Sequence, residues 1–417
     1  MAELVINGCK RLSGDIRVQG AKNSVLPVLA ATVLCECECV IHNCPELSDV
    51  ETSLKILSYL GCKCKKEDNT VTVNAKDISN YDIPDTLMRE MRSSVVFLGA
   101  VIGRTGRAVI SSPGGCELGP RPIDLHLSAL EKMGVTVKEE HGYLICTAEN
   151  GIHGAEITLN FPSVGATENI ILAAVTAQGE TVIHGAAKEP EISDLADFLN
   201  SAGARINGCG SDTVRIRGVE KLGGAEHTII PDRIAAATYM ACAAVTGGNI
   251  TIKNVMPPHM SSIFWLFNES GCKIGINGKS ITLVSPERLS RVPTVRSLVY
   301  PGFPTDAGPI AAALLCKAEG TSVFVENIFE NRFRYVDELK RFGAKIKTEG
   351  KIAVIEGVDN LSAADCKATD LRGGAALVIA ALAANGKSKI GEIRHIERGY
   401  EDITGNLKQL GADIIKE

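Results

Sequence analysis

A six-residue segment, YLGCKC at residues 59–64, marks a unit that recurs along the chain. Each copy ends a helical pattern of apolar residues with a glycine, which suits the left-handed position after a helix, and then begins a strand. Successive copies lie 68 to 73 residues apart, so one unit occurs six times. The other copies are KMGVTV (132–137), SAGARI (201–206), ESGCKI (269–274), RFGAKI (341–346) and QLGADI (409–414).

The order of elements within each unit predicts an α/β fold of two domains. An Ala-rich helix, apolar on all sides, comes first, and a short strand, an amphipathic helix and a strand pair follow. The sixth unit lacks its strand pair, whereas the chain opens with one at INGCKRLSG (6–14). We therefore expect residues 1–21 to join residues 230–417 in one three-unit domain, and residues 22–229 to form the other. Two chain crossings between the domains would suit opening and closing around a ligand.

Composition and charge exclude several classes of protein. The 417 residues carry a formal net charge of −5, which gives no support for binding nucleic acid or a membrane surface through bulk charge. Apolar stretches such as residues 234–245 are too short to span a bilayer. The N-terminal MAELVINGCK lacks the pattern of a signal peptide, so we expect a cytoplasmic protein.

Fourteen cysteines in such a chain are expected to be reduced thiols rather than disulfides. The stretch CECECVIHNC (35–44) could suggest a metal site, but it lacks the paired cysteine spacing of zinc sites. Cys35, Cys37 and Cys39 are expected to be small buried residues. The tripeptides GKS at 278–280 and 386–388 do not complete a phosphate-binding loop, and neither a metal nor another cofactor is predicted.

Polar residues stand where each Ala-rich helix should begin. Helix capping and ligand binding explain Asp232 and Ser163 equally well, so both interpretations stay open. Capping does not explain a cation at a helix N-terminus, because the positive end of the helix dipole disfavours it. A bound anion does explain it, because the helix N-terminus and the cationic side chain can both bind that anion. The helix-start residues are Lys22, Asn23, Arg92, Ser163, Asp232, Arg233, Asp306, Asp370 and Arg372. A second set, in which any single member could be a solvated surface residue, follows the short strands and comprises Arg121, Arg332 and Arg398.

One cysteine, Cys116, stands apart from the apolar patterns. It lies in PGGCELG (113–119), an insertion that lengthens the strand-to-helix link of the second unit. Glycine makes such a loop mobile, and mobile loops on rigid scaffolds often act as lids. A thiol near Arg121 and other cations should ionise or transfer a proton more readily than a buried thiol. The alternative is an incidental surface cysteine.

Eight motifs resemble, in their order, the family of bacterial UDP-N-acetylglucosamine 1-carboxyvinyltransferases, which are enolpyruvyl transferases. The resemblance covers the whole chain and implies two domains, each an inside-out α/β barrel of three βαβαββ units around a pseudo-threefold axis. The motifs are GAKNSVLPVLAATVL (20–34), PGGCELGPRPIDLHL (113–127), SVGATENI (163–170), KEPEISDLADFL (188–199), FPTDAGP (303–309), FENRF (329–333), ATDLR (368–372) and HIERGYE (395–401).

The resemblance implies transfer of the enolpyruvyl group of phosphoenolpyruvate to the 3′-hydroxyl of UDP-N-acetylglucosamine with release of phosphate, the first committed step of peptidoglycan synthesis. It implies that Cys116 delivers a proton, forms a covalent adduct with phosphoenolpyruvate and is alkylated by fosfomycin. Asp306 would be the base, and Asp370 a second acidic residue near the reacting carbons. The residues expected to bind phosphoenolpyruvate are Lys22, Asn23, Arg121, Arg332, Arg372 and Arg398, of which Lys22 and Arg398 are also expected to be catalytic. Those expected to bind UDP-N-acetylglucosamine are Arg92, Arg121, Pro122, Ile123, Asp124, Leu125, Ser163, Val164, Gly165, Asp306 and Ile328.

Two alternatives remain. A shikimate-pathway enolpyruvyl transferase shares the fold and phosphoenolpyruvate, but its other substrate has no nucleotide. A non-catalytic paralogue could bind UDP-N-acetylglucosamine as a sensor, although it would not need Cys116, Asp306, Lys22 and Arg398. Phosphate release with each acceptor separates these alternatives.

Overall fold

The computed structural model of the chain describes residues 2–111 and 123–417, and Arg92 by its backbone alone. The described residues form two compact units. The first, here called the C-terminal unit, contains the chain up to Gln19 and from Pro231 to Glu417. The second, here called the central unit, lies between Gly20 and Ile230. Each unit has its own hydrophobic core.

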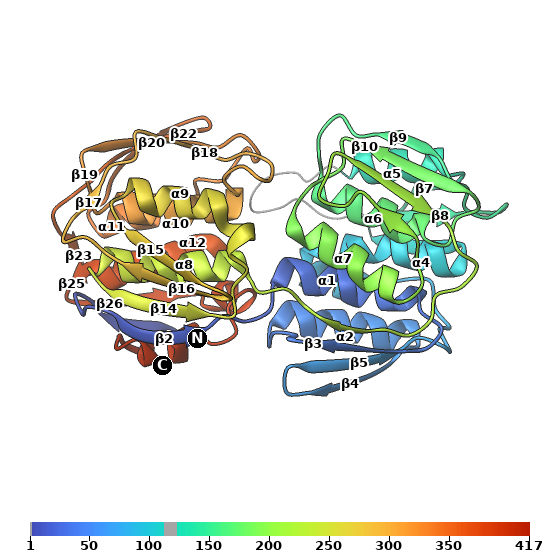
Figure 1. The fold of residues 1–417 in the computed structure, drawn as a ribbon, viewed down its shortest axis with the longest axis horizontal. Helices are drawn as coiled ribbons and strands as arrows, with labels where there is room; N and C mark the ends of the chain where they lie inside the picture. Colours follow the sequence, from blue (N-terminus) through green and yellow to red (C-terminus); the bar gives the residue numbers. More distant parts are fainter. Residues whose placement is uncertain (1, 112–122) are drawn as a thin grey trace. The chain divides into compact units, whose positions relative to one another are not determined.

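Three helices that contact one another form the centre of the C-terminal unit. They are α8 (Arg233–Val245), α10 (Gly308–Leu315) and α12 (Leu371–Ala383). Every residue of α8 and α10 is buried, which confirms that these Ala-rich helices lie inside. Their alanines leave room for neighbouring backbones to approach closely. Figure 1 shows the three helices side by side, with strands of the sheets on the outside of the unit.

Sheets and amphipathic helices cover this centre. The sheet orders are β15-β16-β14-β2, β18-β20-β22-β21 and β24-β26-β1-β27, with the short pairs β17-β19 and β23-β25. The strands are β1 (Leu4–Asn7), β2 (Ser13–Arg17), β14 (Asn249–Lys253), β15 (Lys273–Asn277), β16 (Ser280–Val284), β17 (Leu289–Ser290), β18 (Thr294–Arg296), β19 (Ala318–Glu319), β20 (Thr321–Val325), β21 (Lys345–Glu349), β22 (Ile352–Glu356), β23 (Leu361–Ser362), β24 (Asp365–Lys367), β25 (Ala384–Asn385), β26 (Lys387–Gly391) and β27 (Asp413–Lys416). The other helices are η3 (Pro257–Met260), α9 (Ser261–Glu269), η4 (Thr305–Ala307), α11 (Val336–Arg341), α13 (Arg394–Glu397) and α14 (Ile403–Gln409).

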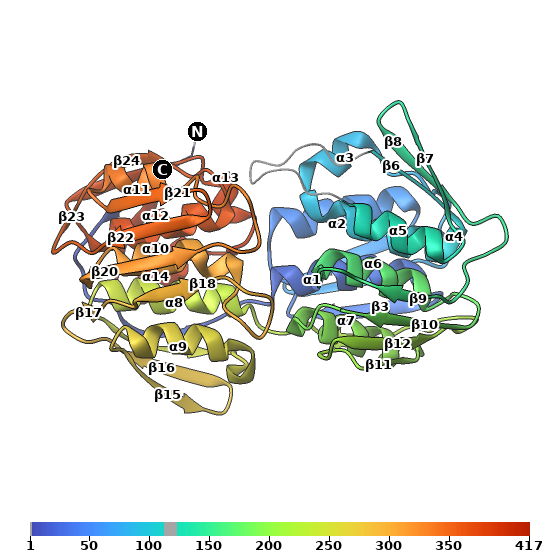
Figure 2. The same cartoon turned by 90° about the horizontal axis from the view of Figure 1, so that it is seen from above.

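The central unit repeats this layering (Figure 2). Helix α4 (Phe97–Thr105) contacts both α1 (Lys22–Ala31) and α6 (Val164–Ala174). The sheet orders are β13-β3-β5-β4, β11-β12-β10-β9 and β6-β8-β7. The strands are β3 (Glu38–His42), β4 (Lys63–Glu67), β5 (Thr70–Asn74), β6 (Arg107–Ser111), β7 (Thr136–Glu140), β8 (Tyr143–Thr147), β9 (Glu156–Thr158), β10 (Glu180–His184), β11 (Ile206–Asn207), β12 (Thr213–Arg217) and β13 (Glu226–Thr228). The other helices are η1 (Thr32–Leu34), α2 (Ser48–Leu60), α3 (Asp85–Glu90), η2 (Arg92–Val96), α5 (Asp124–Lys132) and α7 (Pro190–Ser201).

The six repeated glycines have the backbone conformation that the sequence predicts. All of them lie in the left-handed region, with φ between 82° and 106°, one or two positions after the last residue of a helix and before a strand. A side chain is rarely tolerated in this conformation, so glycine is the residue that ends each helix without strain. The element order of the repeat is therefore confirmed in both units.

The N-terminal strand β1 lies in the sheet of the sixth repeat. It pairs antiparallel with β26 on one side and with β27 on the other. Backbone hydrogen bonds between Glu3 and Glu417, of 3.0 and 2.9 Å, bring the two ends of the chain together beside this sheet (Figure 1). The first strand thus fills the position that β12 and β22 occupy in their own sheets.

At both crossings the strand before the crossing stays in the unit that the chain is leaving. Strand β2 pairs in parallel with β14, although the helix that follows β2 is α1 of the central unit. Strand β13 pairs in parallel with β3, although the next helix is α8 of the C-terminal unit. The crossing segments are also hydrogen-bonded within their own units, from Ala21 N to Ile230 O (2.7 Å) and from Asp232 N to Gln19 O (3.0 Å).

The cysteine-rich stretch differs in part from the expectation. Cys35 and Cys39 are buried, but Cys37 is exposed, so the prediction that it is buried is wrong. The strand alternation on which that prediction rested is interrupted, because residues 36–37 form a bend and β3 begins only at Glu38. Within the described parts of the chain, no helix is long and apolar enough to cross a bilayer.

Candidate functional site

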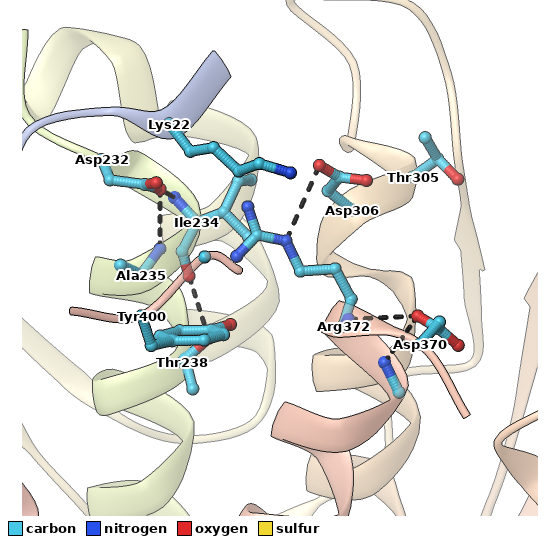
Figure 3. Close-up of polar contacts among 12 residues, drawn as sticks. Lys22, Asp232, Ile234, Ala235, Thr238, Thr305, Asp306, Asp370, Arg372 and Tyr400 are labelled. Carbon is cyan, nitrogen blue, oxygen red and sulfur yellow. Dashed lines mark hydrogen bonds and ion pairs between the residues drawn. The ribbon is translucent and has the colours of Figure 1, made fainter. Parts of the chain in front are cut away.

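The predicted site residues of the C-terminal unit gather around Asp306, which lies on η4 (Figure 3). Arg332 Nη2 lies 2.9 Å from Asp306 Oδ1, and Arg372 Nε lies 3.7 Å from Asp306 Oδ2. Both arginine side chains are almost fully buried, whereas the Asp306 side chain is 30% exposed. The sequence predicts these three residues at one site, and the structure places them together.

Arg372 stacks on the ring of Tyr400, with its guanidinium carbon 5.4 Å from the ring centre. The Tyr400 hydroxyl is fixed in turn by Thr238 Oγ1 at 2.7 Å. Within the described residues, Nε and Nη1 of Arg372 and Nε of Arg332 have no hydrogen-bond acceptor. Buried donors are normally satisfied, so these N–H groups fit an anion such as a carboxylate.

The starts of the three inner helices of this unit meet at Arg372. Burial tends to lower the pKa of Arg372, but its interactions with Tyr400, Asp306 and Asp232 outweigh burial and raise this pKa. Asp370 caps α12 by accepting from the backbone N–H groups of Arg372 (3.0 Å) and Gly373 (2.9 Å). The charged residues that precede α8, α10 and α12 therefore form one cluster, as the helix-start pattern predicts.

All six predicted starts of the Ala-rich helices are found. The helix or 3₁₀ turn begins at Lys22, Arg92, Val164, Arg233, Thr305 or Leu371. Asp232 caps α8, accepting from Ile234 N (2.8 Å) and Ala235 N (2.9 Å), and Ser163 Oγ accepts from Ala166 N (3.3 Å). Asp232 and Ser163 therefore do cap their helices, and a ligand contact of either residue stays a prediction.

Lys22 in the central unit is paired with Asp49, a residue that no pattern in the sequence indicates. Its Nζ lies 2.8 Å from Asp49 Oδ2, and the side chains are 12% and 2% exposed. Asp49 lies in the first turn of α2, where the helix dipole stabilises a carboxylate. The pair therefore orients Lys22 at the start of α1, next to the exposed Asn23.

Two segments predicted to bind a nucleotide sugar lie at the starts of α5 and α6, which contact each other. They are the described part of the run 121–125, residues 123–125, and residues 163–165. His126 follows the first segment, and Asn169 Nδ2 lies 2.9 Å from His126 Nδ1. Asn169 Oδ1 accepts from Gly99 N at 2.6 Å, so the amide nitrogen is the donor to His126. A Cβ on Gly165 would lie 3.1 Å from His126 Cε1, so glycine lets the two segments approach.

Burial lowers the pKa of His126 to about 4. Its Nδ1 is an acceptor, so the neutral ring carries its proton on Nε2. The imidazole is therefore an uncharged link between α5 and α6 at neutral pH.

The remaining predicted residues are placed as follows. Cys116, Arg121 and Pro122 lie outside the described residues, and Arg92 is described by its backbone at the start of η2. Arg398 is half-buried and directly follows α13. Ile328 is half-buried, and its backbone N–H donates to Glu326 Oε1 at 2.7 Å.

Four residues that help to build these sites were not identified from the sequence: Asp49, His126, Asn169 and Tyr400. Each acts through a side chain that meets a residue distant in the sequence, which the repeat pattern does not report. Three of them, His126, Asn169 and Tyr400, do lie inside the motifs PGGCELGPRPIDLHL, SVGATENI and HIERGYE. Their position in these motifs was the available signal, whereas Asp49 lies outside all eight.

Comparison with known proteins gives a consistent set of relatives. The family model described as EPSP synthase (3-phosphoshikimate 1-carboxyvinyltransferase) matches residues 6–407. The chain is 50% identical over 416 residues to UDP-N-acetylglucosamine 1-carboxyvinyltransferase 2 of Caldanaerobacter subterraneus subsp. tengcongensis, covering 100% of both. It is 47% identical over 416 residues to UDP-N-acetylglucosamine 1-carboxyvinyltransferase 1 of Symbiobacterium thermophilum, covering 99% of this chain and 94% of the relative.

Solved structures agree with the architecture. The enolpyruvyl transferase NikO from Streptomyces tendae superposes with a TM-score of 0.89 at 25% identity, covering 100% of this chain and 98% of that one. EPSP synthase from Acinetobacter baumannii superposes with a TM-score of 0.75 at 19% identity, covering 100% of both chains, and shows the fold alone. The expectation of a two-domain, inside-out α/β fold is confirmed.

Proposed function

We propose that this chain, which belongs to the EPSP synthase family of enolpyruvyl transferases, transfers the enolpyruvyl group of phosphoenolpyruvate to the 3′-hydroxyl of UDP-N-acetylglucosamine. Phosphate is released, and the product begins peptidoglycan synthesis. The observation that carries the proposal is the full-length identity to proteins named for this activity. It favours the nucleotide-sugar acceptor over shikimate 3-phosphate.

The reaction is an addition followed by an elimination. The 3′-oxygen bonds to C2 of phosphoenolpyruvate while a proton is added to C3, which gives a tetrahedral phospho-ketal. The C2–O bond to phosphate then breaks, C3 loses a proton, and the double bond is restored. Each step needs a group that gives or accepts a proton, and cations that offset the charge of the phosphate and the carboxylate.

Asp306 is the proposed base for the 3′-hydroxyl. Arg332 and Arg372, within 4 Å of its oxygens, favour the ionised form that can accept a proton. The same arginines are proposed to bind the carboxylate of phosphoenolpyruvate through their N–H groups that lack an acceptor in the described residues. Asp370, which caps α12 beside Arg372, is proposed as the second acidic residue near the reacting carbons.

The phosphate of phosphoenolpyruvate is proposed to bind Lys22, Arg121 and Arg398, with Asn23 beside Lys22. Cys116 is proposed to deliver the proton to C3 and to form the covalent adduct. The nucleotide sugar is proposed to contact Arg92, the runs 121–125 and 163–165, and Ile328. Among the proposed reacting residues, Cys116 and Lys22 belong to the segment 22–229 of the sequence and Asp306 to the segment 230–417.

Phosphate release from phosphoenolpyruvate tests the function directly. We expect turnover with UDP-N-acetylglucosamine and none with shikimate 3-phosphate, and Asp306→Asn should lower kcat by roughly a hundredfold or more. Turnover with shikimate 3-phosphate would overturn the choice of acceptor. Binding of UDP-N-acetylglucosamine without phosphate release would instead indicate a non-catalytic paralogue.

Two finer points belong to the proposal. The first is covalent inactivation by fosfomycin, because an activated thiol opens an epoxide. The second is a cytoplasmic location, because the thirteen cysteines within the described residues are all free thiols, as in a reducing compartment.

A further inference from the structure

Glu326 is a fully buried carboxylate that directly follows β20, with 0% of its surface exposed. Its oxygen Oε1 accepts hydrogen bonds from Ser297 Oγ (2.8 Å), Ile328 N (2.7 Å) and Phe329 N (3.1 Å). Its oxygen Oε2 accepts from Thr305 Oγ1 at 2.9 Å. One carboxylate therefore joins three segments of the C-terminal unit.

Glu326 Oε1 fixes the backbone at Ile328 by accepting a hydrogen bond from its N–H group. Ser297, which donates to Glu326, also accepts from Asn327 N at 2.8 Å, and its carbonyl accepts from Asn327 Nδ2 at 3.0 Å. The turn from Asn327 to Phe329 is thus held at each of its backbone N–H groups. Ile328 is the residue of this turn that is proposed to contact the nucleotide sugar.

Glu326 Oε2 fixes η4, the turn that carries Asp306, by accepting a hydrogen bond from Thr305. Thr305 donates its hydroxyl to Glu326, and its carbonyl accepts from Arg332 Nη2 at 3.2 Å. The same Arg332 nitrogen binds Asp306 Oδ1 at 2.9 Å. Thr305 is therefore held through two groups, its hydroxyl and its carbonyl. Figure 3 shows Thr305 next to Asp306, the proposed base.

A buried charge needs a reason beyond packing. Removing a carboxylate from water is costly unless several hydrogen-bond donors satisfy it. The four donors of Glu326 all come from uncharged groups, and they belong to the segments that carry Ile328 and Asp306. What the carboxylate provides is a fixed geometry between these segments.

We propose that Glu326 is a positioning residue that couples the nucleotide-sugar contact at Ile328 to the base Asp306, with one carboxylate oxygen serving each. This inference rests on the proposed function. Glu326 does not react with the substrate and acts through Thr305 and the Ile328 turn.

Glu326→Gln tests the division of labour between the two oxygens. The N–H groups of Ile328 and Phe329 can only donate, so the amide oxygen should stay on their side and the NH₂ group should face Thr305. We expect kcat to fall by roughly ten- to a hundredfold, the range for losing a charge-assisted hydrogen bond. The KM for UDP-N-acetylglucosamine should stay within about twofold, because the Ile328 side keeps its acceptor.

Thr305 provides a second test that leaves the buried carboxylate in place. Thr305→Val removes the hydroxyl and should reproduce the loss of kcat, whereas Thr305→Ser keeps the hydroxyl and should recover most of it. The double variant Glu326→Gln/Thr305→Val should be little worse than either single variant, because both remove one contact. The matched control is Glu349→Gln, an exposed carboxylate on β21, which should leave kcat and KM unchanged.

Thermal unfolding of each variant separates positioning from loss of the fold. If Glu326→Gln fails to fold, the kcat values of Thr305→Val and Thr305→Ser decide whether the contact between Glu326 and Thr305 positions the base. The inference is overturned if Thr305→Val keeps the wild-type kcat, or if folded Glu326→Gln raises KM while kcat is unchanged. A wild-type protein that releases no phosphate would contradict the proposed function instead.

Discussion

Asn169 holds the buried imidazole of His126 by donating to Nδ1 over 2.9 Å, and its own orientation is set by Gly99 N at 2.6 Å. This relationship joins α5, α6 and α4 through one uncharged histidine. It has consequences for stability as well as for the nucleotide-sugar segments on either side of it.

The first prediction concerns pH. Burial lowers the pKa of His126 from 6.5 to about 4, so the unfolded chain takes up a proton first as the pH falls. The contribution of the neutral His126 to the free energy of unfolding is therefore complete above pH 6.5 and is lost as the pH falls towards 4. The loss for this residue is about 3 kcal/mol.

Urea unfolding of the wild type and of His126→Gln at pH 7, 5 and 4 measures this loss as the difference between the two curves. We expect His126→Gln to show a weaker pH dependence than the wild type. His141→Gln, which removes an exposed histidine, should show the same pH dependence of unfolding as the wild type. Parallel curves for His126→Gln and the wild type would show that His126 titrates normally in the native state.

The second prediction concerns Asp49. Asp49→Asn leaves the charge of Lys22 largely buried without its carboxylate, which should lower the free energy of unfolding by about 3 kcal/mol. Because Lys22 is then less well oriented, the KM for phosphoenolpyruvate should rise roughly tenfold. Urea unfolding and initial rates at varied phosphoenolpyruvate check the two effects separately.

A surface ion pair provides the control for Asp49. Lys63 and Asp77 lie 3.3 Å apart with side chains 78% and 64% exposed, so Asp77→Asn should change stability by less than about 0.5 kcal/mol. Equal losses of unfolding free energy in Asp49→Asn and Asp77→Asn would mean that the Lys22–Asp49 pair stabilises the fold no more than a surface ion pair does.

The third prediction concerns Gly165. A Cβ there would lie 3.1 Å from His126 Cε1, so Gly165→Ala should push apart the two segments that are proposed to bind the nucleotide sugar. The KM for UDP-N-acetylglucosamine should rise roughly tenfold, with a smaller change in the KM for phosphoenolpyruvate. Gly391→Ala is the matched control, because its Cβ would meet nothing closer than 3.8 Å. An unchanged KM in Gly165→Ala would show that the spacing of the segments is not critical.

The fourth prediction concerns fosfomycin. Burial raises the pKa of the Cys146 and Cys272 thiols to about 11, and of the Cys316 thiol to about 12, so these thiols are unreactive. Among the fourteen cysteines, we expect alkylation at Cys116, located by peptide mass spectrometry. The exposed Cys9 and Cys37 report non-specific alkylation in the same digest.

The variant Cys116→Asp separates two roles of the same residue. An aspartic acid can donate a proton but cannot form the thiol adduct, so turnover should persist while sensitivity to fosfomycin is lost. Loss of turnover in a folded Cys116→Asp variant would show that proton donation alone does not sustain the reaction.

The sequence predicts those parts of the fold that depend on local patterns. The glycines at 61, 134, 203, 271, 343 and 411 end helices because of their own backbone freedom, and that property is visible without any partner. The inner helices are recognisable because they are apolar on every side. Cys37 shows the limit of such patterns, since a two-residue bend before β3 breaks the alternation.

The site was less predictable where it depends on tertiary contacts. Asp49 meets Lys22 because two helix starts meet, and the choice of partner among many carboxylates is made by packing. The same holds for Asn169 and His126, and for Glu326 and Thr305. The grouping of Asp306, Arg332 and Arg372 could be anticipated because the resemblance assigns all three to the substrates.

The placement of β1 and β2 governs the order in which the nascent chain can fold. Strands β1 and β2 are translated before the central unit, yet β1 pairs with β26 and β27, which are translated after it. The central unit, whose last strand β13 ends at Thr228, can acquire all its strand partners while the second half is still being translated. Strands β1 and β2 must therefore stay unpaired until these later strands have been translated, and bare strand edges invite aggregation and chaperone capture.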